Sequence, residues 1–331
     1  MAGKERATRK TARKRAARPA RAVRVAMATG EALASEVLRL RNASLRKRAA
    51  AVRRAAPRAV ARARAVPVSP RLIRAAGGPS PLGVLLAEGD SWFDYPWSDV
   101  LKKLEEDHGY DVESVAHMGD RVEDIAYSGR QFEKFSEELE KLLRRSRTPR
   151  AILLSGGGND VAGDEFAMLL EHARSPKPGL NDDVLRGIID GRICNAYITL
   201  ITAVTALCQN RTGTVIPIIL HGYDRPVPDG RGFLGGWGPL PGPWLEPGFR
   251  QKGFDDLDET TIMAGELIDR FNQMMRRVGS VPGFDHVRYV DLRGTLSNGP
   301  NYRTWWANEL HPTGRGFAAV AERFAAVIAR T

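Results

Sequence analysis

Three short segments of the chain carry side chains suited to nucleophilic catalysis. Ser91 lies in "GDSWFD", Asn159 in "GGGND" and His311 in "NELHPT" near the C-terminus. A serine hydroxyl is a poor nucleophile at neutral pH and needs a base within hydrogen-bond reach, which is usually a histidine. The oxyanion of a tetrahedral intermediate needs preorganised donors, and an asparagine amide and backbone N–H groups beside glycines supply them. These residue types indicate acyl transfer at a serine.

The elements that must position these side chains alternate along the chain. The expected strands are 83–90, 110–117, 151–158, 214–222 and 287–292, and the expected helices are 98–109, 121–145, 183–209, 257–278 and a last one bearing Phe317, Val320, Phe324, Val327 and Ile328. This alternation predicts a parallel sheet covered by helices on both faces. Ligands bind at the carboxyl ends of such strands, where Ser91, the glycine cluster, His117, His221 and Asp291 all lie.

The order and spacing of these segments resemble the SGNH/GDSL hydrolase family over residues 82–331. Its first block matches Gly89, Asp90 and Ser91, its second matches Gly119 in "HMGDRVED", its third matches 157–160, and its last matches His311. The resemblance implies a flavodoxin-like three-layer α/β/α sandwich around a mostly parallel five-stranded sheet.

The resemblance also implies roles for the matched residues. Ser91 becomes the nucleophile and His311 its base, while the backbone N–H groups of Ser91 and Gly119 and the amide of Asn159 form the oxyanion hole. The implied activity is that of a serine esterase, acting through an acyl-enzyme on a carboxylic ester, a thioester or an acetylated sugar. No cofactor is implied.

One position departs from the family pattern. Three residues before His311 the family usually has an aspartate, and this chain has Asn308. A neutral amide can accept the imidazole Nδ1–H and fix the tautomer, but it cannot stabilise imidazolium with a full charge. The site is then a Ser-His dyad or a Ser-His-Asn triad, unless another carboxylate, such as Asp291, supplies the charge.

An aromatic stretch at 224–249 follows the fourth expected strand and therefore belongs on the catalytic side of the sheet. Long irregular loops at such places are often lids or binding loops. We name Trp92, Trp237, Trp244 and His221 as candidate substrate contacts. Aromatic walls suit acyl chains, aryl esters and sugar rings alike, so the substrate stays open.

Residues 1–81 form a basic Ala/Arg-rich tail and linker, expected to be largely disordered or partly helical, before the hydrolase domain at 82–331. Residues 1–76 contain 22 Lys and Arg against 3 Asp and Glu, a net charge of +19, while the remainder is −8. The tail is either a solvated arm, a contact to nucleic acid or another polyanion, or a membrane-surface or targeting segment. An alternative function follows: a polyanion-binding protein whose hydrolase domain is catalytically weak.

Several other classes of protein are disfavoured by the sequence. It has no Gly-x-Ser-x-Gly elbow, no phosphate-binding loop and no His-Glu-x-x-His pair, so we expect neither a larger α/β-hydrolase nor a zinc or other metal site. The sequence has no run of 18 apolar residues, so it predicts no transmembrane helix, and its start lacks the apolar centre of a secretory signal. Cys194 and Cys208 fall in one expected helix, about 21 Å apart, too far to pair, which favours a cytoplasmic location.

Overall fold

A computed structural model of the chain describes residues 20–62, 81–235 and 240–331. At its centre lies one parallel sheet of five strands. These are β1 (Val84–Glu88), β2 (Asp111–Ser114), β3 (Ala151–Leu154), β6 (Ile218–His221) and β7 (Val287–Val290), in the spatial order β2-β1-β3-β6-β7. This is the flavodoxin-like order, in which the second strand lies at one edge. Every residue of β1, β3 and β6 is buried, as expected for strands covered on both faces.

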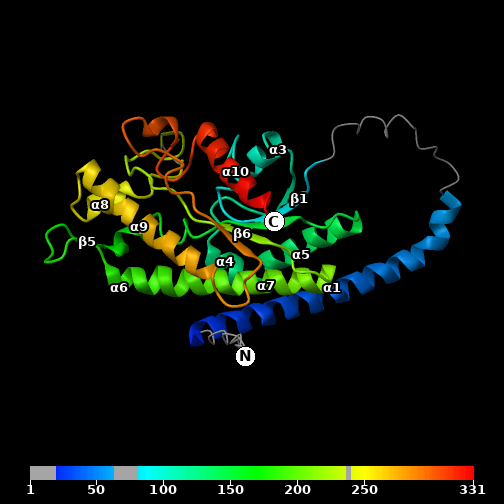
Figure 1. The fold of residues 1–331 in the computed structure, drawn as a ribbon. Coiled ribbons are helices and arrows are strands. Elements are labelled where there is room, and N and C mark those ends of the chain that lie inside the picture. Colours follow the sequence, from blue (N-terminus) through cyan, green and yellow to red (C-terminus); the bar gives the residue numbers. More distant parts are fainter. Residues whose placement is uncertain (1–19, 63–80, 236–239) are drawn as a thin grey trace, which may run out of the picture.

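Helices cover both faces of the sheet and complete the three predicted layers (Figure 1). One face carries α3 (Val100–Glu106) and α10 (Gly314–Ile328), and the other carries α5 (Gly129–Arg144), α7 (Cys194–Thr212) and α9 (Leu257–Val278). Right-handed crossovers between parallel strands require this division, because the connection to β2 runs opposite to the later ones. The predicted fold class is confirmed for the sheet and its helices.

Shorter elements join these layers. They are α4 (Val122–Tyr127), the 3₁₀ turn Phe166–Leu169, β4 (Leu170–Glu171) paired antiparallel with β5 (Gly179–Leu180), α6 (Asp182–Leu185), a π-helical segment Arg186–Ile193, the 3₁₀ turns Phe233–Gly235 and Tyr302–Thr304, and α8 (Glu246–Gln251). The single helix expected over 121–145 is two helices, because Ser128 takes an extended backbone (φ −84°, ψ 102°) between α4 and α5.

One long helical stretch has the length and composition of a membrane-spanning segment. Among the described residues, only Asp182–Thr212 is long and apolar enough to span a bilayer, and 67% of its apolar window is buried inside the fold. That burial is the pattern of a core helix. Cys194 and Cys208 both lie on it, and both are free thiols.

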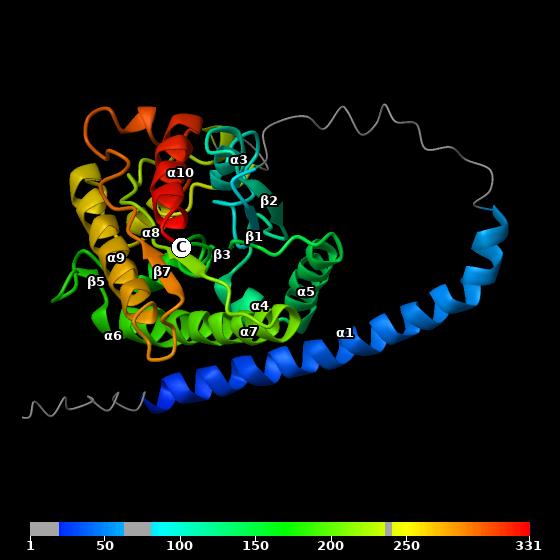
Figure 2. The same ribbon diagram turned by 45° about the vertical axis from the view of Figure 1, so that its right-hand side comes forward.

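A further helix, α1 (Arg21–Arg62), lies against the outer side of α7 (Figure 2). A Cβ atom on Gly30 would lie 2.3 Å from the Thr199 carbonyl oxygen, so only glycine permits this approach. The Thr199 hydroxyl donates to the carbonyl oxygen of Ala26 at 3.1 Å. Small residues therefore bring the two helices into close contact.

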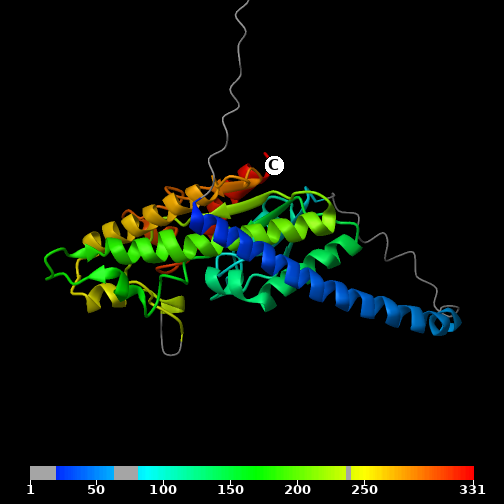
Figure 3. The same cartoon turned by 90° about the horizontal axis from the view of Figure 1, so that it is seen from below.

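The docked part of α1 differs from a solvated arm. Ala26, Ala34 and Val37 are buried in the same core as the sheet, and Arg41 pairs with the buried Glu140 of α5 at 2.9 Å. The far half of α1 extends beyond the rest of the fold, as two views agree (Figures 2 and 3). Residues 1–19 and 63–80 lie outside the described residues, so the rest of the predicted tail and linker stays a prediction.

Candidate active site

The predicted nucleophile and base meet at the carboxyl end of the sheet. Ser91 lies in the turn directly after β1, and its Oγ is 2.7 Å from His311 Nε2. Asp90 shapes that turn, because its Oδ1 accepts the backbone N–H of Trp92 at 3.0 Å. Ser91 and His311 are both buried, with 6% and 5% of their surface exposed. The distance is that of a hydrogen bond from hydroxyl to imidazole.

Asn308 fixes the proton on the other side of the histidine ring. Its Oδ1 accepts the backbone N–H groups of Leu310 at 3.0 Å and His311 at 2.9 Å, and it lies 3.0 Å from His311 Nδ1. Backbone N–H groups only donate, so the atom facing them must be the oxygen. Nδ1 therefore carries the ring proton, which leaves Nε2 free to accept from the Ser91 hydroxyl.

Aromatic rings enclose the histidine. Tyr95 stacks on His311 with ring centroids 4.2 Å apart, and the edge of Trp244 meets it at 5.4 Å. The Tyr95 hydroxyl also accepts from Asn308 Nδ2 at 3.0 Å, so one side chain holds both the ring and its partner. Burial without a neighbouring carboxylate lowers the pKa of His311 to about 3. The imidazole is consequently neutral, the form needed in a base.

The oxyanion donors expected from the sequence lie in the turns after β2 and β3. Gly119 occupies the turn after β2 with φ +93°, a conformation that favours glycine. Asn159 follows β3, and its Nδ2 donates to the carbonyl oxygen of Asp120 at 3.0 Å, which ties it to the Gly119 turn and leaves its second N–H available. The Asp160 carboxylate accepts the backbone N–H groups of Val122 at 2.8 Å and Glu123 at 3.3 Å. Asp160 therefore holds the start of α4 and does not face a reactant.

A buried polar cluster surrounds Asp90, the residue before the nucleophile. Ser155 Oγ lies 2.6 Å from Asp90 Oδ1 and 2.8 Å from His221 Nε2. His221 is fully buried, and its ring packs against Phe324 of α10 and stacks on Trp92, which lines the cavity described next. His221 is not among the residues that line this cavity, so its predicted contact with substrate stays a prediction.

A cavity of about 60 Å³ opens beside Ser91 and His311. Its polar rim includes Asn159, and its inner wall is apolar. The inner wall is formed by Val161, Ala162, Ile189, Leu245, Ala264, Leu267, Ile268 and Phe271. Trp92 also borders it, but that ring is 3% exposed and its Nε1 donates to the carbonyl oxygen of Leu310 at 3.1 Å. Trp92 therefore holds the histidine segment as much as it offers a surface to a ligand.

Glu309, next to Asn308, has a separate task that the sequence did not reveal. Its carboxylate is fully buried and accepts four backbone N–H groups, from Gly230, Trp244, Leu245 and Glu246, at 2.6–3.1 Å. All four donors belong to the stretch 224–249. The histidine segment is thus joined to the aromatic loop, and Trp244 is held against His311.

The remaining sequence candidates lie elsewhere. His117 is 76% exposed and lies 3.9 Å from Asp120. Asp291 pairs with Arg293 and Arg276 instead of His311, and the Arg293 guanidinium holds the pKa of this carboxyl at about 2. Trp237 lies outside the described residues. Within the described ranges, no three His, Cys, Asp or Glu side chains are grouped so as to hold a metal ion.

A sequence model of the GDSL-like lipase/acylhydrolase family matches residues 78–319. The chain belongs to this family. Membership makes it a hydrolase that acts on ester bonds, in agreement with the predicted family and enzyme class. No curated protein matches the sequence at a significant level.

Solved structures similar to this GDSL-like hydrolase include the lipase Lip_vut3 from a goat rumen metagenome, at 15% identity and a TM-score of 0.48, covering 74% of this chain and 96% of that one. A putative platelet activating factor protein from Streptococcus pneumonia has 14% identity and a TM-score of 0.41, and the match covers 78% of this chain and 88% of that one. Axe2 from Geobacillus, an acetyl-xylooligosaccharide esterase studied as its R55A mutant, has 13% identity and a TM-score of 0.38, covering 76% and 95%.

Proposed function

We propose that this GDSL-like hydrolase cleaves a carboxylic ester through an acyl-enzyme on Ser91, with His311 as the base and Asn308 as its neutral partner. The observation that carries the proposal is the Ser91 Oγ to His311 Nε2 contact of 2.7 Å, together with the Asn308 Oδ1 that holds the opposite nitrogen. Ser91 attacks the ester carbonyl carbon while its proton passes to Nε2. The oxyanion is held by the N–H groups of Ser91 and Gly119 and by the Asn159 amide.

The two halves of the reaction use the same groups. As the tetrahedral intermediate collapses, the bond to the alcohol oxygen breaks and His311 returns its proton to that oxygen. Water then attacks the acyl-enzyme, gives a proton to Nε2, and releases the carboxylic acid while Ser91 regains its hydrogen. Asn308 keeps the Nδ1 proton in place throughout, and the Tyr95 ring limits rotation of the imidazole.

Turnover of a small soluble ester such as p-nitrophenyl butyrate tests this proposal. Replacement of Ser91 or of His311 by alanine should lower kcat at least ~10³-fold, because each change removes a group that acts in both half-reactions. Ser128→Ala is the matched control, since that hydroxyl makes no capping hydrogen bond and lies in the turn between α4 and α5. Wild-type turnover by folded Ser91→Ala would contradict the proposal.

We propose a second role, polyanion binding, for the basic N-terminal region. Arg39, Arg46, Lys47 and Arg48 are exposed on α1, while the face with Ala34 and Val37 is buried. Replacing Arg46, Lys47 and Arg48 by serine spares that face, so ester turnover should not change. Affinity for double-stranded DNA at low salt should fall, and so should its salt dependence, by about one unit for each lost phosphate contact. Unchanged DNA affinity would count against this role.

A further inference from the structure

We infer that the cavity beside Ser91 is an acyl-chain site, and that this hydrolase prefers esters of unbranched acids of about four to six carbons. This rests on the proposed function, because the chain is placed by the carbonyl that Ser91 attacks. The cavity measures about 60 Å³, and one water needs ~10–15 Å³ of such space, so there is room for about four to six non-hydrogen atoms. A sugar ring with its substituents is larger than that.

The chemistry of the inner wall selects an apolar chain. Ala264, Leu267, Ile268 and Phe271 come from one side of α9, and Ile189 comes from the π-helical segment that faces them. Unusual helical turns of this kind occur often at functional sites. A polar alcohol group buried here would lose its hydrogen bonds to water without replacement, whereas each methylene gains free energy by leaving water.

We assign the cavity to the acyl chain of the ester, and not to the alcohol, because the two groups behave differently after Ser91 attacks. The leaving alcohol must receive a proton at Nε2 and depart, and a water must then take its place beside His311. The acyl chain stays bound through both steps, so an apolar site beside the nucleophile can hold it without blocking water. Two residues of the cavity wall are in direct contact, because a Cβ added to Gly157 would lie 2.5 Å from the Phe271 ring.

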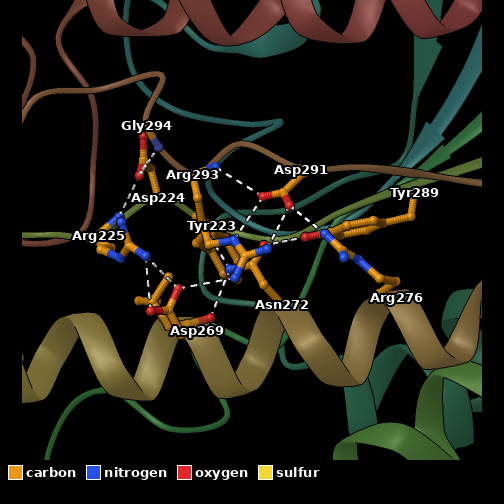
Figure 4. A network of polar contacts seen from close by, with 11 residues as sticks. Tyr223, Asp224, Arg225, Asp269, Asn272, Arg276, Tyr289, Asp291, Arg293 and Gly294 are labelled. Carbon is orange, nitrogen blue, oxygen red and sulfur yellow. Dashed lines mark hydrogen bonds and ion pairs between the residues drawn. The ribbon is translucent and has the colours of Figure 1, made fainter.

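The α9 wall is held in place by a network of ion pairs and hydrogen bonds (Figure 4). Asp269 follows Ile268 of the wall. Its carboxylate accepts two hydrogen bonds of 2.9 Å from the Arg225 guanidinium and one of 3.1 Å from the Arg293 guanidinium. Arg225 follows β6 and Arg293 follows β7, so the network ties α9 to the carboxyl ends of two strands. A second tie runs from the Asn272 amide to the carbonyl oxygen of Tyr223 at 2.9 Å. The cavity is therefore set before an ester arrives.

The experiment compares p-nitrophenyl esters from acetate to dodecanoate on the full chain. Burial of each methylene should raise kcat/KM about fourfold, so hexanoate should exceed acetate by about two orders of magnitude, with a decline beyond the filled length. Ala264→Leu should fill the cavity and lower hexanoate turnover far more than acetate turnover, so that most of the hexanoate-to-acetate ratio is lost. Leu267→Ala should shift the optimum to longer chains. Ile262→Ala is the matched control, because Ile262 lies on the same helix and is 64% exposed.

Two results would overturn the inference. One is a kcat/KM that stays flat or falls as the acyl chain lengthens from acetate, while acetate turnover still depends on Ser91. The other is a series of acetate esters with lengthening alcohols that shows the optimum and responds to Ala264→Leu. In both results the proposed function stands, whereas loss of the proposed function appears as turnover that Ser91→Ala does not reduce.

Discussion

Asn308 determines which nitrogen of His311 is free to act. Its carbonyl oxygen is fixed by two backbone N–H groups, and its amide nitrogen donates to Tyr95. The orienting hydrogen bond is thus made without a negative charge, and burial alone lowers the pKa of the imidazole to about 3. The structure answers the question raised by the sequence: among the described residues, the group at Nδ1 is Asn308, and Asp291 is engaged by arginines.

Asn308→Asp should move the acid limb of the rate profile to higher pH. The variant's Oδ1 can keep its three contacts, and Oδ2 can accept from the Tyr95 hydroxyl after that group rotates. A carboxylate beside Nδ1 favours imidazolium and raises the pKa of His311 from about 3, so His311 becomes protonated at a higher pH as the solution is acidified. Measured kcat/KM should therefore fall between pH 7 and 5 in the variant and hold in the wild type.

Asn308→Ala provides the complementary measurement. It removes the orienting acceptor, and kcat should fall roughly ten- to a hundredfold, well short of the ~10⁴ known for a serine protease built around an aspartate. Circular dichroism at each pH separates catalysis from unfolding. If the alanine variant matches the wild type and the aspartate variant shifts nothing, Asn308 does not orient His311.

At the scale of elements, the segment between the Tyr302–Thr304 turn and α10 performs two tasks with adjacent residues. Asn308 acts on His311, and Glu309 holds the loop that carries Trp244. A second buried carboxylate, Glu88, ends β1 and differs at one oxygen. Both Glu309 oxygens accept two N–H groups each, whereas Glu88 Oε1 accepts from Gly89 and Gln131 but its Oε2 has no partner within the described part of the chain.

Replacing each carboxylate by glutamine should therefore change stability in opposite directions. In Glu309→Gln an NH₂ group must face two N–H donors, so about 2–4 kcal/mol should be lost at neutral pH from the two broken bonds. Trp244 would also lose its restraint, which should raise KM. Thermal unfolding and steady-state kinetics measure both effects.

For Glu88, burial raises the pKa to about 8 from an ordinary value near 4.5. The folded state then holds a proton that the unfolded chain releases, so this contribution to stability is complete below about pH 4.5 and is lost as the pH rises to about 8. Glu88→Gln needs no proton and should melt above the wild type at pH 9 and close to it at pH 4. A lower melting temperature for the variant at pH 9 would refute this assignment.

At the scale of the whole molecule, the sequence specifies the catalytic domain better than its surroundings. Strand periodicity and the order of Ser91, Asn159 and His311 sufficed for the sheet and the nucleophile–base pair, because strand ends in a parallel sheet converge. The contacts of Tyr95, Trp244 and Glu309 depend on the path of a long loop, which local patterns do not encode. His221 is fully buried at the end of β6 and does not line the cavity, and a strand-end position alone does not determine whether a side chain reaches a ligand.

The N-terminal region shows the same limit. Its Ala/Arg composition is compatible with helix or with a solvated chain, and the choice between them depends on a partner surface. Gly30 permits close approach to α7, and Arg41 meets the acidic side of α5. Those matches link residues more than 90 positions apart, so composition alone could not predict them.

We propose that Ser91, and not Ser155, is activated for attack on a carbonyl or its analogue. The protein contains a second serine–histidine contact, Ser155 to His221 at 2.8 Å, and Ser155 is buried. It therefore serves as an internal control.

The most direct measurement is reaction of the folded full chain with a fluorophosphonate probe, followed by peptide mass mapping. We expect a stoichiometric adduct on Ser91 and none on Ser155, no labelling of Ser91→Ala, and strongly slowed labelling of His311→Ala. Absence of an adduct on the folded wild type, or labelling that persists in Ser91→Ala, would refute the activation of Ser91 and favour the polyanion-binding alternative.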